Sequence, residues 1–432
     1  MPNQTSRPVS AYERINAMHS VTIVGAGLAG HASAKALRAQ GFAGRITVVG
    51  GEQHRPYDRP PLSKDFLAGT IDYAELALEA EDEDLGVEWM LGSTAVHLDP
   101  AERRVALAGG ESIVSDVVII ATGSSSKTLG QSLAGVHTVR SIEDAIALRS
   151  ELLPGARLVV VGSGFIGLEI ASTARDLGLD VVVLGSSLWP LSRIFGDTIA
   201  TAVQRLHERR GVIVRNRMTV SSVLGRDAGI RSDEPDRVTG VRLGSGEVVP
   251  ADVVVVGIGS IPGTAWLEDS GLEIDGGVVC DGIGATSVAG IFAVGDCSAW
   301  FDAVRGRTHR VEHWTDSRDR AALMVAGILG TPVPSSALRP SYLWSDQCGV
   351  RIQFAGRLLG GEELTVEAGA VENGDPLVVY RRFGEPVAVV GIDQQKLVAQ
   401  WRKKLTARPD SAPSSALTHI PAPPTRIPQE QT

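Results

Sequence analysis

Cysteine and histidine are scarce in this sequence, which has three Cys and nine His among 432 residues. Cys280, Cys297 and Cys348 lie far apart and form no CxxC or CxxxxC pair, so a redox-active dithiol of local spacing is not expected. We interpret them as small, partly buried thiols. The histidines form no HxH or HExxH cluster, so no metal site is predicted.

Long apolar runs and an excess of positive charge are also absent. No apolar run reaches the roughly 18 residues that a membrane-spanning helix needs, and residues 1–20 contain no apolar segment typical of a signal peptide. We therefore expect a cytoplasmic protein without a membrane partner. The net charge of −9 argues against nucleic acid as a partner. The length predicts about two to four domains.

A glycine-rich turn follows the first apolar segment. Residues 21–24 predict a short buried strand, and His31–Gln40 predicts a helix. The GxGxxG motif between them consists of Gly25, Ala26, Gly27, Leu28, Ala29 and Gly30. Its glycines permit a tight turn, close approach of a pyrophosphate and close helix–strand packing. A second strand at Ile46–Val49, with Glu52 close behind, completes the pattern of a dinucleotide site.

The same pattern occurs a second time. Leu158–Val161 predicts a buried strand, Leu168–Leu177 a helix and Val181–Leu184 a second strand. The motif between the first strand and the helix consists of Gly162, Ser163, Gly164, Phe165, Ile166 and Gly167. Two matches in the right context favour two dinucleotide sites over two structural glycine turns.

Three further predicted strands end in glycine-containing segments. Val117–Ile120, Asp252–Val256 and Ile291–Val294 are the strands. The segments after them are, in order, Ala121-Thr122-Gly123, Gly257-Ile258-Gly259 and Gly295-Asp296. Asp296 thus follows the carboxyl end of a strand, where ligands of open α/β sheets bind. Its carboxylate suits a hydroxyl-rich chain such as ribityl, and a helix-capping acid is the alternative.

The remaining segments predict the outline of the chain. Strands are expected at 87–90, 95–98, 104–107, 112–114, 212–214, 221–224 and 242–249, and short or long helices at 65–69, 310–329 and 394–405. Residues 226–237 predict an exposed hairpin tip, and 331–340 a proline-containing linker. Residues 1–18 are expected to be loose, and the Pro- and Ser-rich residues 406–432 to be disordered.

Six motifs together resemble those of the FAD-dependent ferredoxin reductases of oxygenase systems. They are PYDRPPLSK (56–64), the two glycine motifs, ATG (121–123), AVGDC (293–297) and LWSDQ (343–347). The resemblance covers about residues 19–405 and implies an α/β, glutathione-reductase-like fold. It implies an FAD-binding domain at 19–125 and 251–330, an NAD(P)-binding domain at 126–250 and a small α+β domain at 335–405.

The resemblance also implies the residues of both cofactor sites. FAD contacts are expected from the first glycine motif, with Ala29 at the phosphates, from the ATG segment, and from Glu52, Arg59, Lys64, Val96, Arg140, Gly295, Asp296, His313, Trp314 and Trp344. NAD(P)H contacts are expected from the second glycine motif and from Glu169, Gly185, Ser186, Arg193, Gly257, Ile258 and Gly259. For the two tryptophans, plain core packing is the alternative.

Lys64 and Glu169 carry the main mechanistic expectation. The resemblance implies that the lysine lies near N5 of the flavin and that the glutamate pairs with it. A cation at that position stabilises negative charge on reduced flavin. The alternative is a solvated lysine and a glutamate on a helix surface, which fits Glu169 poorly because this residue directly follows the glycine turn.

The sequence departs from the resemblance at both nucleotide loops. Gly51 stands where relatives have an acid, so Glu52 must reach the ribose of FAD. Gly185 replaces the acid that would bind the adenosine ribose of NADH, and Ser186, Ser187 and Arg193 are available to a 2′-phosphate. The choice between NADH and NADPH therefore stays open. Cys348 stands where relatives often have Tyr.

The predicted function is electron transfer from NAD(P)H through FAD to a [2Fe–2S] ferredoxin. That ferredoxin would feed a Rieske dioxygenase or a haem-thiolate monooxygenase. An NADH oxidase, peroxidase or disulfide reductase would need a cysteine near the flavin, and Pro60–Phe66, where it would lie, contains none. A second alternative is a nucleotide-sensing interaction protein of the apoptosis-inducing-factor type.

Overall fold

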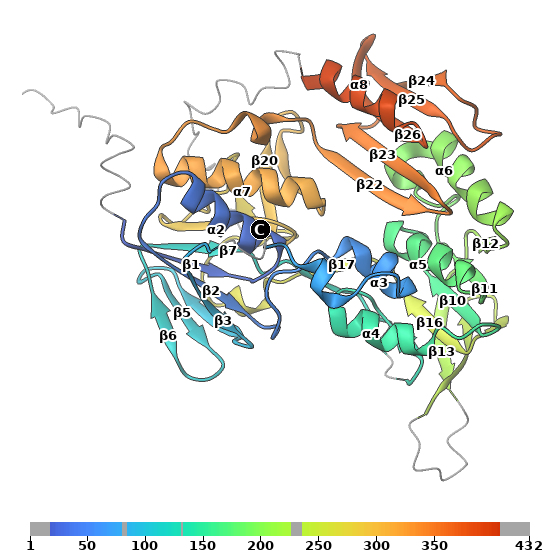
Figure 1. Cartoon of the computed structure of the whole chain (residues 1–432), viewed down its shortest axis with the longest axis horizontal. Coiled ribbons are helices and arrows are strands. Elements are labelled where there is room, and N and C mark those ends of the chain that lie inside the picture. Colours follow the sequence, from blue (N-terminus) through green and yellow to red (C-terminus); the bar gives the residue numbers. More distant parts are fainter. Residues whose placement is uncertain (1–17, 80–83, 131–132, 226–235, 407–432) are drawn as a thin grey trace, which may run out of the picture.

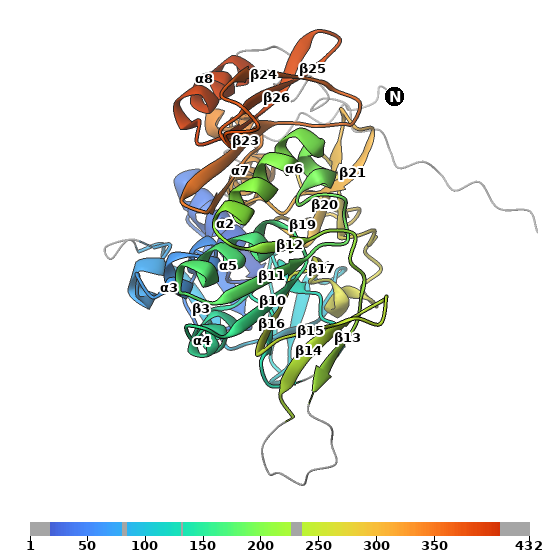
Figure 2. The ribbon, with the colours of Figure 1, turned by 90° about the vertical axis from the view of Figure 1, so that its right-hand side faces the viewer.

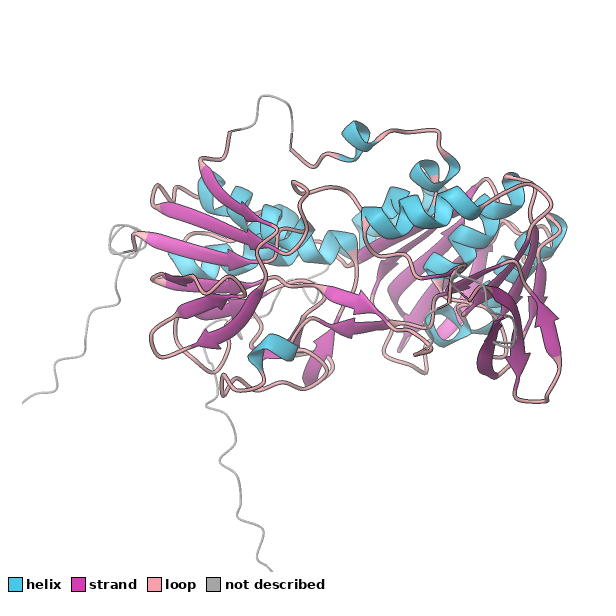
Figure 3. Cartoon of the chain, turned by 90° about the horizontal axis from the view of Figure 1, so that it is seen from below, coloured by secondary structure: helices cyan, strands magenta, loops and turns pink. Residues whose placement is uncertain are grey.

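The chain forms three units, each built on one large sheet (Figure 1). The computed structural model describes residues 18–79, 84–130, 133–225 and 236–406. The first unit is built from two segments of the chain, the second unit is inserted between them, and the third follows both (Figure 1). Figure 2 shows the third unit above α6 of the second, and Figure 3 shows the long helices packed against the strands.

A parallel five-stranded sheet carries the first glycine motif. Its order is β19 (Ile291–Ala293), β7 (Val117–Ile120), β1 (Ser20–Val24), β2 (Arg45–Gly50) and β3 (Val87–Leu91). Helices α2 (Leu28–Ala39) and α7 (Trp314–Leu329) pack against each other over this sheet (Figure 1). The strands are apolar on both faces because helices and loops cover both, as is usual for parallel sheets.

A second parallel sheet repeats this plan around the second glycine motif. Its order is β12 (Ile213–Arg215), β11 (Asp180–Leu184), β10 (Arg157–Val161), β16 (Val253–Val256) and β9 (Val136–His137). The helices of this unit are α4 (Ile142–Glu151), α5 (Phe165–Asp176) and α6 (Ser192–Arg209). In both units the glycine motif follows the strand that pairs with the ATG-type strand, so the duplication predicted from the sequence is confirmed.

The third unit is an antiparallel sheet covered by one helix. Its order is β22 (Tyr342–Gln347), β23 (Val350–Gly356), β26 (Glu385–Ile392), β25 (Leu377–Arg382) and β24 (Glu363–Ala368), and α8 (Gln395–Thr406) packs on it. One hydrophobic core joins this sheet to the second unit, with Phe195, Phe354 and Ile352 among its buried members. Burial of this shared core fixes the third unit against α5 and α6.

Smaller elements connect and extend the units. They are β4 (Ala95–Asp99), β5 (Arg104–Leu107), β6 (Ser112–Val114), β13 (Val220–Gly225), β14 (Val238–Leu243), β15 (Val248–Pro250), β18 (Val278–Cys280), β20 (Ser298–Asp302), β21 (Arg307–Arg310), the 3-10 helices η1 (Pro60–Ser63), η2 (Tyr73–Leu76), η3 (Ala265–Leu267) and η4 (Ser335–Leu338), and α3 (Asp65–Ala68). The two chain crossings between the first and second units pair with each other as β8 (Ser124–Ser126) and β17 (Ser260–Pro262).

The structure corrects three sequence-based predictions. The strand predicted at 242–249 is a hairpin, because residues 244–247 turn the chain between β14 and β15. The helix predicted from Arg310 begins at Trp314, because residues 307–310 pair with β20. The domain boundary predicted between residues 250 and 251 is wrong, because β16 is a central strand of the second sheet.

Two further predictions fall mainly on residues that are not described. The hairpin tip at 226–237 and the loose ends at 1–18 and 406–432 lie almost wholly outside the described residues. Within the described part of the chain, no helix combines the length and the apolar composition needed to span a bilayer.

Candidate functional site

A cavity of about 770 Å³ lies between the first unit, the second unit and the third unit. The first glycine motif and strand β22 both contribute residues to its wall. Of the residues predicted to bind cofactors, those that line it are Gly25, Gly27, Leu28, Ala29, Glu52, Arg59, Lys64, Ala121, Thr122, Gly123, Arg140, Phe165, Ile166, Glu169, Asp296, His313, Trp314 and Trp344. Most of the residues predicted to bind FAD therefore line a single cavity.

The glycine motif is shaped by close backbone contacts. Gly25 has φ +122°, and a Cβ there would lie 2.1 Å from the carbonyl oxygen of Ala121. A Cβ on Gly30 would lie 1.9 Å from the carbonyl oxygen of Gly25, whereas a Cβ on Gly27 would meet nothing within 4 Å. Gly27 therefore faces the open cavity, and it begins α2 without any side chain capping the helix. The free N–H groups of this helix terminus suit a phosphate.

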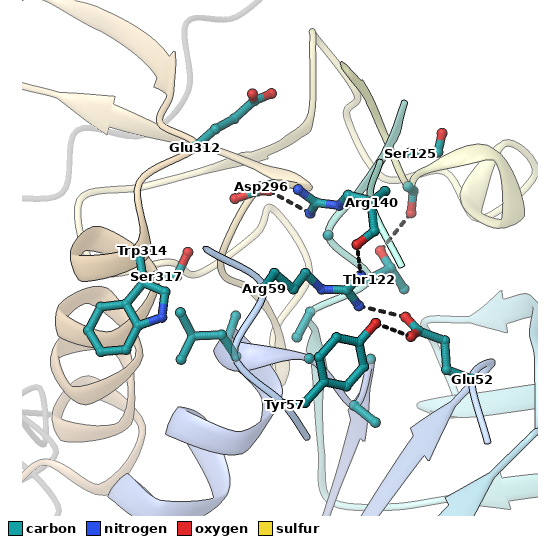
Figure 4. A pocket seen from close by; sticks show the side chains of 18 of the residues that line it. Glu52, Tyr57, Arg59, Thr122, Ser125, Arg140, Asp296, Glu312, Trp314 and Ser317 are labelled. Atoms are coloured by element: carbon teal, nitrogen blue, oxygen red, sulfur yellow. Dashed lines mark hydrogen bonds and ion pairs between the residues drawn. The ribbon is translucent and has the colours of Figure 1, made fainter. Parts of the chain in front are cut away.

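The middle of the cavity is lined by a network of charged side chains (Figure 4). Arg140 Nη2 lies 2.7 Å from Asp296 Oδ2, and the Ser124 hydroxyl donates to the same oxygen at 3.2 Å. The Glu52 carboxylate accepts from Arg59 Nη2 and from the Tyr57 hydroxyl, each at 2.5 Å. Asp296 and Glu52 are thus held in fixed orientations at the wall of the cavity.

Tyr57 was not predicted as a site residue. Its hydroxyl also accepts from the backbone N–H of Ile142, and burial raises the pKa of the phenol. Its ring lies beneath the Arg59 guanidinium at 5.0 Å. The residue lies within the PYDRPPLSK segment, so its position was visible, but only the tertiary structure shows that it anchors Glu52.

Two tryptophans, Trp314 of α7 and Trp344 of β22, line the cavity as well. The ring centroids of Trp314 and Trp344 are 5.7 Å apart, with an interplanar angle of 71°. The Trp314 indole N–H donates to Asp58 Oδ1 at 2.7 Å. Burial raises the pKa of the Asp58 carboxyl, and the indole hydrogen bond and the charge of Lys64 oppose that rise. The tryptophans therefore line the cavity rather than fill the core.

Lys64 and Glu169 meet as predicted. Lys64 Nζ lies 2.7 Å from Glu169 Oε2, and the side chains are 13% and 6% exposed. The ammonium also donates to the carbonyl oxygen of Pro60 at 2.9 Å, and the Ser63 hydroxyl donates to Glu169 Oε2 at 2.6 Å. The pair joins the loop after β2 to helix α5, at the edge of the cavity.

The remaining predicted residues do not line this cavity. Val96 is 48% exposed, and its neighbours Ser93, Thr94 and Ala95 line the cavity instead. Gly30 and Gly295 pack behind the first motif. The other predicted residues outside it belong to the second unit: Gly162, Gly164, Gly167, Gly185, Ser186, Arg193, Gly257, Ile258 and Gly259.

The second glycine motif has the same backbone geometry as the first. Gly162 has φ +112°, and a Cβ there would lie 2.1 Å from the carbonyl oxygen of Gly257. A Cβ on Gly164, the residue before α5, would meet nothing within 4 Å. A Cβ on Gly185 would lie 2.6 Å from the Ser163 hydroxyl. The loop after β11 is therefore closely packed against the glycine turn.

Comparison with known proteins assigns the family. The model of the pyridine nucleotide-disulphide oxidoreductases matches residues 19–321, and a reductase C-terminal model matches residues 342–420. The chain belongs to the pyridine nucleotide-disulphide oxidoreductases. This family uses FAD and NAD(P)H. The open glycine turn, the uncapped helix and the paired Arg140 and Asp296 fit an FAD molecule along the cavity.

Several relatives are similar over nearly their whole length. A ferredoxin–NAD(P)(+) reductase from Sphingomonas sp. is 34% identical over 90% of this chain and 93% of its own. The ferredoxin–NAD(+) reductase subunit of the benzene 1,2-dioxygenase system of Pseudomonas putida is 36% identical over 86% and 89%. Among solved structures, putidaredoxin reductase in its covalent complex with putidaredoxin superposes with a TM-score of 0.83, at 29% identity over 92% and 96%.

Cysteine chemistry is not part of this cavity. None of the described residues that line it is a cysteine. Cys280, Cys297 and Cys348 are free and buried, and burial raises the pKa of the Cys348 thiol to about 11. Despite the word disulphide in the family's description, the cavity offers no thiol to a bound cofactor. No group of three or more metal-ligating side chains occurs within the described ranges.

Proposed function

We propose that this chain is an NAD(P)H-dependent ferredoxin reductase that passes electrons through FAD to a [2Fe–2S] ferredoxin. The observation that carries the proposal is the buried Lys64–Glu169 pair beside a cavity that is lined by two tryptophans and lacks a thiol. The relatives named as ferredoxin reductases of dioxygenase systems support it. Bound FAD supplies the chemistry, because it takes up two electrons as hydride and releases them singly.

Each part of the cavity has a role in this proposal. The N-terminus of α2 binds the pyrophosphate, since its N–H groups and partial positive charge face the cavity. Asp296 accepts hydrogen bonds from the ribityl hydroxyls, and Arg140 holds its carboxylate in place. Glu52 binds the adenosine ribose from the position fixed by Arg59 and Tyr57. Ser93, Thr94 and Ala95, rather than Val96, provide the wall for the adenine.

Lys64 places its positive charge at the redox end of the cavity. Glu169 would compensate that charge, and the ammonium would stabilise negative charge on bound FAD. Phe165 and Ile166, which begin α5, line the cavity next to Glu169 and leave room for the nicotinamide. The second glycine motif would then bind the pyrophosphate of NAD(P)H in the same manner as the first.

The backbone of Arg217 lies against the loop that lacks the acid. Its backbone N–H donates to the carbonyl oxygen of Ser187, and the N–H of Met218 donates to that of Gly185. These two hydrogen bonds hold the loop that contains Gly185 and Ser187 next to Arg217, a residue that was not predicted from the sequence. Since no carboxylate stands at Gly185 to repel a 2′-phosphate, the proposal includes use of both nucleotides.

The ferredoxin would approach at the tryptophan end. Arg318 lies 5.1 Å from the Trp314 ring centroid, and Arg402 lies 4.4 Å from that of Tyr342, which stacks on Trp344. Burial and the charges of Arg339 and Arg318 lower the pKa of Arg402, and Tyr342 and Asp319 oppose that fall. Guanidinium groups on the aromatic rings at this face suit an acidic partner.

Stopped-flow reduction with NADH and NADPH, followed by reduction of a [2Fe–2S] ferredoxin, tests the proposal. We expect flavin bleaching with both nucleotides and steady-state ferredoxin turnover that is slowed by Arg318→Glu and Arg402→Glu. A charge-conserving control, Arg339→Lys, should keep full turnover. Rapid flavin bleaching with no electron transfer to any ferredoxin would favour the nucleotide-sensing alternative instead.

A further inference from the structure

A buried chain of polar side chains runs from Glu169 into the third unit. The Ser345 hydroxyl donates to Glu169 Oε1, and Gln347 Nε2 donates to the Ser345 hydroxyl at 2.8 Å. His207 Nε2 lies 2.9 Å from Gln347 Oε1. The four residues are between 0% and 5% exposed. They come from α5, β22 and α6, so the chain crosses between two units.

The donor and acceptor of each hydrogen bond between His207 and Glu169 can be assigned. Gln347 presents its carbonyl oxygen to His207, so the imidazole must carry its proton on Nε2. Within the described residues, Nδ1 of His207 is buried without a hydrogen-bond partner, and burial lowers the pKa of the ring. A neutral His207 donates to Gln347, which donates to Ser345, which donates to the carboxylate. Every donor therefore points toward Glu169.

These hydrogen-bonded side chains hold Oε1 of Glu169, the carboxylate oxygen that Lys64 does not contact. Lys64 and Ser63 both contact Oε2, and Ser345 contacts Oε1. A carboxylate held at one oxygen can pivot about that contact, whereas one held at both oxygens cannot. The contact to Oε1 comes from β22, which belongs to the third unit.

We propose that Ser345, supported by Gln347 and His207, is a positioning residue for the Lys64–Glu169 pair. The third unit thereby sets how far Glu169 compensates the charge of Lys64. This inference rests on the proposed function for the charge of Lys64, but the contact itself can be tested independently of electron transfer.

Ser172 provides a matched control at the same interface between α5 and the third unit. It is a buried serine of α5, and its hydroxyl accepts from the backbone N–H of Cys348 at 2.7 Å. Ser172→Ala therefore removes one hydrogen bond between α5 and the turn after β22, as Ser345→Ala does, without touching Glu169. Gln347→Met is a second test variant, because it keeps the size of the side chain and removes the donor to Ser345.

The experiment uses the FAD-loaded protein and two readouts. The first is the thermal unfolding midpoint in a double-mutant cycle of Ser345→Ala with Glu169→Ala. The second is the midpoint potential of the flavin. We expect non-additive unfolding midpoints, and a positive potential shift in Ser345→Ala of the same sign as in Glu169→Ala, because both leave the Lys64 charge less compensated. The rate of flavin reduction at saturating NADH should change about tenfold in Ser345→Ala and less than twofold in Ser172→Ala.

The outcomes separate the inference from the proposed function. Additive unfolding midpoints, or a potential shift in Ser345→Ala no larger than in Ser172→Ala, would overturn the positioning role. A Ser345→Ala effect that persists undiminished in the Glu169→Ala protein would also overturn it. If Glu169→Ala and Lys64→Ala both leave the potential and the reduction rate unchanged, the proposed role of the pair fails, whatever the unfolding cycle shows. If Ser345→Ala does not fold, Gln347→Met decides by the same criteria.

Discussion

Removal of Lys64 or Glu169 should change hydride transfer in a coupled manner. The ammonium and carboxylate are 2.7 Å apart and nearly buried. With an effective dielectric constant of about 20, their attraction is about 6 kcal/mol before the desolvation of both charges is subtracted. Since desolvation offsets most of this energy, we expect a coupling of about 0.5–3 kcal/mol in a double-mutant cycle.

The two single variants should act in opposite senses on the flavin potential. Lys64→Ala removes a cation and should lower the potential and slow reduction, with FAD still bound. Glu169→Ala leaves the cation uncompensated and should raise the potential. The double variant should lie close to Lys64→Ala, because Glu169 acts through the lysine.

The assay is stopped-flow bleaching of the flavin by saturating NADH in the four proteins. A matched control is the Arg157–Asp252 pair, also at 2.7 Å, which lies on the second sheet away from the cavity. Its cycle should leave the reduction rate unchanged. Strictly additive effects of Lys64→Ala and Glu169→Ala on that rate would refute the reasoning and leave only the cofactor sites.

Four further outcomes are expected. Asp296→Ala should weaken FAD retention on gel filtration by about 1.5–3 kcal/mol, since it removes a charged acceptor; full retention would contradict its role. Wild type should discriminate between NADH and NADPH by less than about a hundredfold in kcat/KM, near 2.7 kcal/mol, and Gly185→Glu should shift preference toward NADH once its Cβ displaces the Ser163 hydroxyl. Replacing all three cysteines by Ser or Ala should leave ferredoxin reduction largely intact, and loss of flavin bleaching in a folded, yellow variant would revive a thiol mechanism. The hydrogen bond and charge of Arg157 lower the pKa of Asp252 to about 2. The ion pair therefore adds stability above the pKa that Asp252 has in the unfolded chain, and this stability is lost as the pH falls toward 2. The difference in melting temperature between wild type and Asp252→Asn should shrink from pH 4 to pH 2, and a constant difference would count against the pair.

The strand–glycine–helix units could be predicted from the sequence because their determinants are local. Each needs an apolar run, glycines at fixed spacing and a helix former, and the backbone contacts of Gly25 and Gly162 show why no other residue fits. The Lys64–Glu169 contact is not local. It was expected only from resemblance, and the structure confirms that the two side chains meet.

Elements with interrupted patterns escaped prediction. Helix α6 was not expected, because Gly196, with φ +75° in its first turns, and Pro190 just before it hide the helical periodicity. The sequence pattern predicts one strand across the end of β14 and β15, and the turn at residues 244–247, which contains Gly244 and Gly246, divides it into a hairpin. Tyr57, Ser345 and Arg217 were missed for another reason, which is that the tertiary fold sets their contacts. Tyr57 contacts Ile142 of the second unit, Ser345 contacts Glu169 of that unit, and Arg217 contacts Ser187 in another loop.

Strand β22 shows why the third unit belongs to the site. Successive side chains of a strand point to opposite faces. Trp344 lines the cavity beside Trp314, and the next residue, Ser345, donates to Glu169. One strand therefore contributes to the surface proposed for the ferredoxin and to the support of the pair proposed to hold charge beside the flavin. A partner that displaces the backbone of β22 at Trp344 would therefore also displace Ser345 and, through it, the carboxylate that compensates Lys64.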